Sequence, residues 1–371
     1  MLGGDLPSQA EPMIRLLRNA LLTLLVLFAL LWVLASQLSW QPEPRETLPV
    51  SCRASNAALV PGQVLKVMTW NVQYLAGKRY VFWYDQGHGD DTRPTPEDLA
   101  FNLDEVARVI RTEQPDIVLL QELDNNAKAS GYQDQLTLLR ERLVDIYPCA
   151  VQAYDWKADF VPDWHIFGSV GRTLATLSRY PIKQAERLQL PVDASNAWQR
   201  LLQPQQAILA SYLPLRDGGQ LAVLNTRLAA FAAGSDIQRQ QVQQLTHLLD
   251  KLESQGTPWL IGGDFNLLPL GQYRRLPAEL RGQYSADSDL HLLWDKYPMI
   301  PNNAEASGAE RATWLTHYPN DRNLQGPDRT LDYLFHSPKL QRLGAQVIQQ
   351  DTLEISDHLP VTARLLLPVQ P

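Results

Sequence analysis

The sequence predicts an α/β fold with mixed sheets, preceded by one hydrophobic N-terminal helix. Apolar runs of strand length alternate with segments of helical periodicity along the chain. Several of the runs are joined by short turns, such as residues 217–219, that suit antiparallel neighbours. An apolar fraction of 45% in 371 residues is ample for a large core. These three observations favour a layered α/β domain.

The N-terminal segment has the pattern of a membrane-targeting sequence. Residues 20–35 contain no charge, and with the apolar residues before them they reach the roughly 20 residues that a spanning helix needs. Arg15 and Arg18 precede this run, so the N-terminus is expected in the cytoplasm and the rest on the exported side. The alternative is a cleaved signal peptide, because Ala35 and Ser36 are small residues near a cleavage position. The predicted parts are a cytoplasmic tail (1–12), a single-pass transmembrane signal anchor (13–38), a linker (39–62) and a periplasmic or extracellular domain (63–368).

Charge and cysteine content narrow the class of protein. The net charge is −7 and no run of Lys or Arg occurs, which argues against holding nucleic acid through a broad basic face. A nuclease that makes a few local contacts stays compatible with this balance. The two cysteines, Cys52 and Cys149, both lie on the exported side, where they either form one disulfide or remain two thiols.

The helices of the domain have recognisable start signals. Thr95 is a predicted N-cap with Pro96 at the first helical position, and this helix ends before Pro115. Ser235 and Gln238 have the spacing of a capping box at the start of a second long helix. A shorter helix is predicted near residues 133–145. After a first strand that ends on Trp70-Asn71, further strands are predicted at 116–122, 172–178, 206–213, 220–226, 258–264, 331–336 and 360–366.

Polar side chains follow several of these strands at their C-terminal ends. Glu122 comes directly after an apolar run, where a carboxylate is costly to bury unless it is paired or bound to a metal. Carboxylate and amide oxygens are the ligands that Mg²⁺ takes. Asp264 and Asn266 follow two glycines and would point to the same side if extended geometry continued through Phe265. A carboxylate there could orient or deprotonate a water, and an amide could donate to a phosphoryl oxygen.

The C-terminal part adds a carboxylate and imidazole group. Asp332 is a charge within an apolar strand and needs a partner, for which His358 is the natural candidate. Asp357 is a further carboxylate that can bind a metal, and Asn71 ends the first strand. A fold that gathers these strand ends would form a site for a hard cation and a phosphate ester.

These segments resemble the endonuclease/exonuclease/phosphatase superfamily of metal-dependent phosphoesterases, which includes nucleases, neutral sphingomyelinases and inositol-polyphosphate phosphatases. The resemblance runs from about residue 63 to 367, through residues 68–72, 116–122, 177–182, 223–226, 263–266, 331–333 and 356–361. It implies a four-layer α/β/β/α sandwich of two mixed sheets and a requirement for Mg²⁺, with Mn²⁺ as a substitute. The implied roles are metal binding by Glu122, Asn71 and Asp357, action on the water and the phosphate by Asp264 and Asn266, and an Asp332–His358 pair.

One position departs from the family pattern. The family commonly has a His after Asn-Thr in its central motif, and this chain has Arg227 there. An Arg can hold a phosphate in a bidentate manner and stabilise its charge, but it does not cycle a proton at neutral pH. We therefore expect Arg227 to bind the scissile phosphate; the alternative is that it only forms a salt bridge with a surface Asp or Glu. Leaving-group protonation then falls to metal-bound water or another residue, or activity is reduced or redirected.

The resulting prediction is a monomeric, membrane-anchored, Mg²⁺-dependent hydrolase of phosphate esters, a phosphodiesterase or a phosphatase. Its substrate classes remain open: nucleic acid, phospholipid head groups or small phosphate esters. The alternative is a catalytically reduced, exported binding module on the same fold. The aromatic loop at residues 80–84 could stack on bases, dip into a membrane interface or cover the sheet edge.

Overall fold

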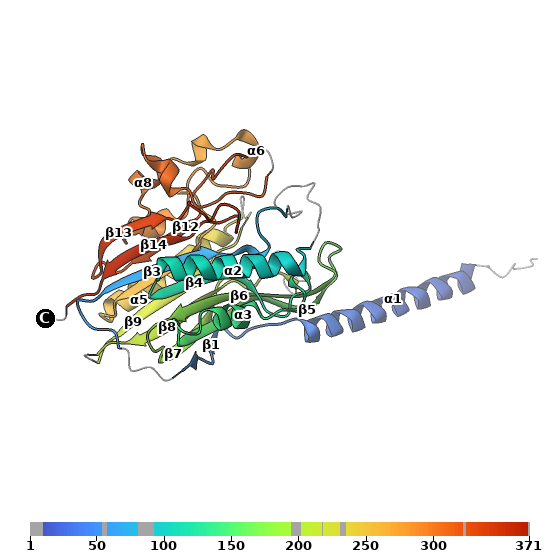
Figure 1. Cartoon of the computed structure of the whole chain (residues 1–371). Helices are drawn as coiled ribbons and strands as arrows, with labels where there is room; N and C mark the ends of the chain where they lie inside the picture. Colours follow the sequence, from blue (N-terminus) through green and yellow to red (C-terminus); the bar gives the residue numbers. More distant parts are fainter. Residues whose placement is uncertain are drawn as a thin grey trace, which may run out of the picture.

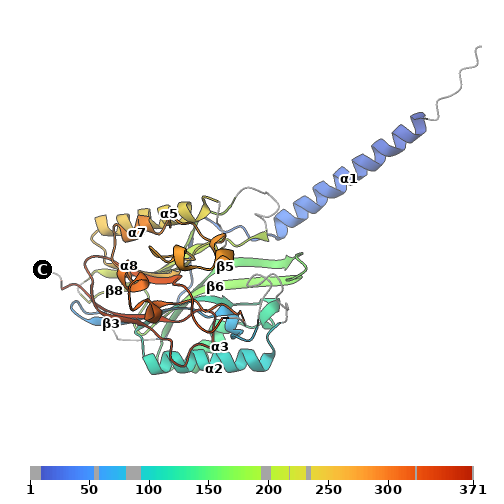
Figure 2. The same ribbon diagram turned by 90° about the horizontal axis from the view of Figure 1, so that it is seen from above.

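A computed structural model shows two seven-stranded mixed sheets packed face to face, with helices on both outer faces (Figures 1 and 2). The α/β sandwich that the sequence predicted is confirmed. The residues that the structure describes are 10–53, 58–80, 93–193, 202–216, 218–230, 235–321 and 324–369.

Each sheet has one parallel pair of strands at its centre. In the first sheet β3 runs parallel to β4, and in the second sheet β9 runs parallel to β10. The other pairs are antiparallel. The first sheet has the order β13 (Gln341–Val347), β14 (Val361–Leu366), β3 (Val64–Asn71), β4 (Ile117–Asp124), β6 (Gly168–Ser178), β5 (Cys149–Val161) and β2 (Ser51–Cys52). The second has the order β1 (Arg45–Thr47), β7 (Gln184–Gln189), β8 (Ala207–Pro214), β9 (Gln220–Arg227), β10 (Trp259–Asp264), β12 (Asp332–His336) and β11 (Met299–Ile300).

The helices divide between the two outer faces. α2 (Pro96–Glu113) and α3 (Gln135–Arg142) cover the first sheet, whereas α5 (Ile237–Ser254) and α7 (His291–Trp294) cover the second. A third apolar cluster fills the space between the sheets. The remaining short helices are α6 (Ala278–Arg281), α8 (Asn303–Ser307), η1 (Gln73–Leu75), η2 (Lys128–Ser130), η3 (Tyr273–Arg275) and η4 (Arg311–Trp314).

The two predicted helix starts have different outcomes. The Thr95 side chain accepts a hydrogen bond from Asp98 N at the start of α2, as an N-cap does. The capping box predicted for α5 is wrong, because its N-cap is Asp236, which makes no side-chain capping bond. The Gln238 amide instead donates to Ala229 O (2.7 Å) and Asn266 O (3.1 Å). Buried carbonyl groups need hydrogen-bond donors. Because the Gln238 side chain donates to these two carbonyls, it does not cap the start of α5.

The N-terminal helix α1 (Ala10–Leu38) extends away from the domain (Figures 1 and 2). Its segment Pro12–Leu30 is long and apolar enough to span a membrane and is not buried against the domain. By these criteria α1 could be a membrane span or a signal sequence. Within residues 39–62, expected to form a linker, β1 pairs with β7 and β2 pairs with β5. This segment is therefore attached to both sheets.

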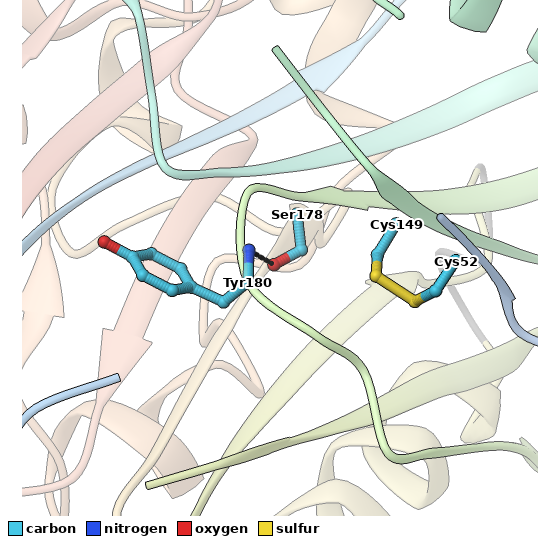
Figure 3. The surroundings of a disulfide bond; sticks show 4 residues. All are labelled: Cys52, Cys149, Ser178 and Tyr180. Carbon is cyan, nitrogen blue, oxygen red and sulfur yellow. Dashed lines mark hydrogen bonds between the residues drawn. A yellow bond between two sulfur atoms is a disulfide. The ribbon is translucent and has the colours of Figure 1, made fainter. Parts of the chain in front are cut away.

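Cys52 and Cys149 form a disulfide between β2 and β5, where they are paired in register (Figure 3). Next to the bridge, the Tyr180 N–H donates to Ser178 Oγ at 3.0 Å. A disulfide together with an exposed apolar N-terminal helix is the pattern of an exported protein.

Candidate active site

One edge of the sandwich collects the polar strand ends. Asn71 ends β3, Arg227 ends β9 and Asp264 ends β10, while Glu122 lies near the end of β4. Asp332 is the first residue of β12 and pairs in register with Asp264. Asp357 and His358 come just before β14, which pairs with the end of β3. The fold thus brings all the side chains that the sequence singled out to the same edge.

Glu122 is held in an unusual backbone conformation. It is the extra residue of a β-bulge, because Gln121 and Leu123 pair with consecutive residues of β6. Its φ is +58°, in the left-handed region that a non-glycine residue rarely adopts. Bulges re-aim side chains and are common next to active sites. Here the bulge belongs to the strand end that carries the candidate metal ligand.

Arg227 lies against the Glu122 carboxylate, with Nε 2.6 Å from Oε1. The same Nε is 3.6 Å from Asp264 Oδ2. Burial by itself raises the pKa of Glu122, but the guanidinium groups of Arg227 and Arg172 outweigh burial and hold the pKa below its ordinary value. Glu122 is therefore ionised at neutral pH, and Arg227 is its counter-ion in this structure.

The Asp264 carboxylate is the centre of the cluster. Its Oδ2 accepts from Asn71 Nδ2 (3.2 Å) and Asn266 Nδ2 (2.9 Å), and its Oδ1 accepts from Asn266 N (3.0 Å). The extended geometry expected through Phe265 does not continue, since Asn266 has φ +51°. This turn folds the Asn266 amide back onto Asp264. The two side chains converge through the turn rather than through strand alternation.

His358 joins two carboxylates. Its Nδ1 is 2.7 Å from Asp332 Oδ2, and its Nε2 is 3.9 Å from Asp264 Oδ2. Burial by itself lowers the pKa of His358, but Asp332 and Asp264 raise it to about 10. Burial raises the pKa of Asp332 to about 6. At neutral pH, then, the pair consists of a carboxylate and an imidazolium.

Two glycines before Asp264 let the backbones and the sheets approach closely. A Cβ at Gly263 would lie 2.0 Å from Thr226 O, and one at Gly262 would lie 2.9 Å from a Leu119 methyl across the sandwich. Neither glycine has a positive φ, so their role is close approach and not a turn.

Buried amides connect the two sheets beneath the site. Gln121 Nε2 donates to Asn225 Oδ1 (2.7 Å) across the sandwich, and Asn225 Nδ2 donates to Leu120 O and Ala175 O (both 2.9 Å). Buried hydrogen bonds of this kind form in only one arrangement of their partners. This network therefore fixes how the two sets of strand ends face each other.

A second buried charge group beside the site was not predicted. Arg172 Nε lies 2.9 Å from Asp155 Oδ1, and both side chains are almost fully buried. Asp155 sits at a bulge of β5, and Arg172 pairs in register with Asp124. Burial raises the pKa of Asp124 to about 7. An Arg and an Asp within strand sequences are visible in the chain, but their pairing across a bulge is not.

His317 is another residue that sequence reasoning did not select. Its ring centroid is 4.7 Å from that of His358. Burial lowers the pKa of His317 to about 3, so this imidazole is neutral at pH 7. Of the aromatic loop, Tyr80 is buried and its hydroxyl contacts Asp98; residues 81–84 lie outside the described residues.

The charge balance of the cluster suits a divalent cation. Glu122, Asp264, Asp332 and Asp357 supply four carboxylates, and the nearby cations are Arg227, His358 and Arg172, of which Arg172 is also paired with Asp155. Burial raises the pKa of Asp357 to about 6, as expected for a carboxylate that lacks enough nearby positive charge. Among the described residues, Asp264, Asp332 and His358 offer ligand atoms within 4.8 Å of one another, as do His317, Asp357 and His358. The edge therefore contains candidate metal-binding groups; of the predicted ligands Glu122, Asn71 and Asp357, Asp357 belongs to one of these groups and Glu122 to neither.

Comparison with known proteins assigns the chain to a family. The profile of the Endonuclease/Exonuclease/phosphatase family matches residues 68–358. The chain belongs to this family. This match confirms the family that the strand-end motifs predicted. Members of the family are metal-dependent phosphoesterases. No individual curated protein sequence matches the chain.

Solved structures share the fold at low sequence identity. The endonuclease/exonuclease/phosphatase from Beutenbergia cavernae aligns with 82% of this chain and 72% of its own, with 20% identity and a TM-score of 0.55. A family protein from Leptotrichia buccalis aligns over 81% and 99%, with 14% identity and a TM-score of 0.53. The protein from Bacteroides vulgatus aligns over 82% and 99%, with 15% identity and a TM-score of 0.50.

Proposed function

We propose that this protein is a membrane-anchored, Mg²⁺-dependent phosphoesterase whose catalytic domain acts outside the cytoplasm. The observation that carries the proposal is the environment of Asp264. One buried carboxylate contacts two amides and has an arginine and an imidazolium within 4 Å. A carboxylate that is held in place by donors can orient a water and accept its proton. The surrounding cations would stabilise negative charge on phosphorus-bound oxygens.

The side chains divide into proposed roles. Asp264 orients and deprotonates the attacking water, and Asn266 fixes this carboxylate through its amide and its backbone N–H. His358, kept cationic by Asp332, donates to a phosphoryl oxygen. Arg227 binds the scissile phosphate as a permanent charge. Since an Arg does not release its proton at neutral pH, protonation of the leaving group requires a different donor.

The proposed ligands of the metal ion are Glu122, Asn71 and Asp357. The ion is Mg²⁺, for which Mn²⁺ could substitute. Oxygen donors from carboxylates and an amide are the set that Mg²⁺ prefers. When bound, the ion supplies positive charge that polarises the phosphate ester. Asn71 is suitably placed, since its Oδ1 already accepts from Gln73 N (3.1 Å) and its Nδ2 donates to Asp264. The side chain is thus fixed in orientation before an ion binds.

The last part of the proposal is that α1 is an uncleaved transmembrane anchor. Residues 13–38 would span the membrane and residues 63–368 would form the catalytic domain, with the N-terminus in the cytoplasm and the protein a monomer. The unburied apolar segment Pro12–Leu30 and the Cys52–Cys149 disulfide support export. The substrate class within phosphate esters stays open among nucleic acid, phospholipid head groups and small phosphate esters.

Turnover and metal dependence test the function together. The purified full-length protein should hydrolyse bis-p-nitrophenyl phosphate or a member of a panel of plasmid DNA, sphingomyelin and inositol phosphates. Activity should require Mg²⁺ or Mn²⁺ and disappear in excess EDTA. Undiminished turnover after exhaustive chelation would refute the metal dependence. Absence of turnover on the whole panel, with retained binding to one member, would favour the second candidate, a binding module in which Arg227 replaces the catalytic His.

A further inference from the structure

The hairpin formed by β5 and β6 has an apolar, aromatic tip. Three aromatic side chains there are exposed: Phe160 by 49%, Trp164 by 80% and Phe167 by 58%. Phe160 and Phe167 pack edge to face across the hairpin, with ring centroids 5.1 Å apart. Large aromatic groups that gather at one protruding point, with so much of their surface open, mark an interaction site.

The chain that leaves α1 is attached to this hairpin. Ser39, the first residue after α1, forms an antiparallel bridge with Ala158 of β5. Trp40 packs edge to face on Tyr154, with ring centroids 6.0 Å apart. Both views show the hairpin pointing to the side on which α1 leaves the domain (Figures 1 and 2). The aromatic tip therefore lies beside the C-terminal end of the apolar helix.

We propose that this tip is a second membrane contact, with Phe160, Trp164 and Phe167 inserted among the lipid head groups while α1 anchors the chain. Aromatic side chains favour the membrane–water interface. The occupant is a lipid surface because the helix bound to the same hairpin is itself apolar enough to span a bilayer. The proposal rests on the anchor part of the proposed function and not on catalysis.

Charges at the tip indicate how it binds. Lys157 and Lys128 balance Asp159 and Asp163, and Lys128 Nζ donates to Phe167 O at 2.5 Å. A tip without net charge gains little from anionic lipids, so contact depends on apolar insertion and should be insensitive to salt. Zwitterionic phosphatidylcholine is therefore a sufficient lipid.

The contact would also orient the candidate active site. Arg172 of β6 pairs with Asp124 at the end of β4, and the first four residues of β6, Gly168 to Gly171, extend beyond that end. At about 3.3 Å per residue, the hairpin projects roughly 13 Å past the edge that holds Glu122. A tip inserted in the bilayer would turn this edge toward the membrane surface.

The test uses the full chain reconstituted in phosphatidylcholine liposomes. An environment-sensitive fluorophore is attached to a single introduced thiol, in Trp164→Cys or in the control Val369→Cys, without reductant so that the native disulfide stays closed. Val369 is also exposed and follows β14, which ends on the side of the domain opposite to α1 (Figure 1). Quenching is then measured with a nitroxide-bearing lipid and with aqueous iodide.

The label at 164 should be quenched by the lipid nitroxide and shielded from iodide about threefold or more relative to the label at 369. Both effects should persist in about 0.5 M salt, which is roughly three to five times the concentration at which exposed charges are already largely screened. Equal responses at the two positions would overturn the proposal. The labels report position whether or not the protein turns over substrate, so a failure of catalysis is separately visible. Cleavage of α1 in the native host, read from the mass of the mature protein, would refute the anchor and with it the reason for assigning a lipid surface to the tip.

Discussion

The two sheets contribute different chemistry to the shared edge. The first sheet carries Asn71 and Glu122, with Asp357 just before β14, which are the proposed metal ligands. The second carries Arg227 and Asp264 at the ends of its parallel pair, which are proposed to act on the phosphate and the water. The proposed metal ligands thus come from one sheet, and the proposed base and Arg227 come from the other.

The contacts that cross between the sheets join the two sets. Asn71 donates to Asp264, Arg227 lies against Glu122, and His358 reaches Asp332. Beneath them, the Gln121–Asn225 hydrogen bond fixes the relative position of the two sheets. Neither sheet alone has a complete site, so correct packing of the sandwich is a condition for activity.

The largest expected effects distinguish the proposed roles of the two sheets. Asp264→Asn should lower kcat by 10²–10⁴-fold, since a positioned general base is worth about that much, and should leave Mg²⁺ affinity within a few-fold of wild type. Glu122→Gln should instead weaken Mg²⁺ binding by at least about 100-fold, because even residues that only support metal ligands are worth 10–100-fold. Steady-state kinetics and calorimetric Mg²⁺ titration measure both quantities.

Asp250→Asn is the matched control, since Asp250 lies on α5 and pairs with Lys296 at the surface. It should be silent in both assays. If Asp264→Asn and Glu122→Gln had the same profile, the division of roles between the sheets would be wrong.

A smaller effect is expected where the sheets meet at Arg227. Arg227→Ala should lower kcat and kcat/KM on the order of 100-fold by removing a charge from the phosphate. It should also tighten Mg²⁺ binding roughly tenfold, because the guanidinium that competes for Glu122 Oε1 is gone. Arg227→His should restore part of the activity and add an acid limb to the pH–rate profile.

Arg239→Ala, an exposed arginine of α5, serves as the control for loss of a positive charge. Wild-type kcat in Arg227→Ala, with a flat pH profile in Arg227→His, would show that Arg227 has no role at the phosphate.

The smallest effect concerns stability. The folded protein raises the pKa of His358 to about 10, whereas an unfolded His titrates near 6.5. The stabilisation is therefore complete below about pH 6.5 and is lost as the pH rises toward 10. In EDTA, the unfolding free energy should fall between pH 7 and 10 by on the order of 2 kcal/mol more in wild type than in His358→Gln. Urea denaturation at several pH values in this range measures the unfolding free energy of both proteins. If the free energies of wild type and His358→Gln changed in parallel with pH, the charged pair would be refuted.

The sequence predicted the strands that carry the site better than the others. β3, β4 and β10 are apolar runs that end in a polar residue, so both their existence and their direction could be read. β5 contains Lys157 and two Asp, and β13 alternates Gln, Arg and Gly, so neither has the apolar pattern of a buried strand. Their identity comes from pairing with neighbours, which local sequence does not encode.

That these side chains gather at one edge was predictable, but their contacts were not. Strand ends place Asp264 and Glu122 at one edge, yet the left-handed turns at Glu122 and Asn266 that aim their side chains depend on tertiary packing. The ion pair of Arg227 with Glu122 crosses between sheets, and Arg172 pairs with Asp155 across a bulge. Such contacts follow from which strands become neighbours, and a single sequence does not specify that.

The Cys52–Cys149 disulfide has a consequence for proteolysis. Asn71, α2 and Glu122 all lie between the two cysteines. A protease that cuts once between residues 53 and 148 leaves two pieces joined through sulfur. The larger piece, with Asp264 and His358, then stays tethered to α1. Cleavage anywhere in this closed loop therefore cannot by itself separate the domain from α1, whereas a cut between α1 and Cys52 can.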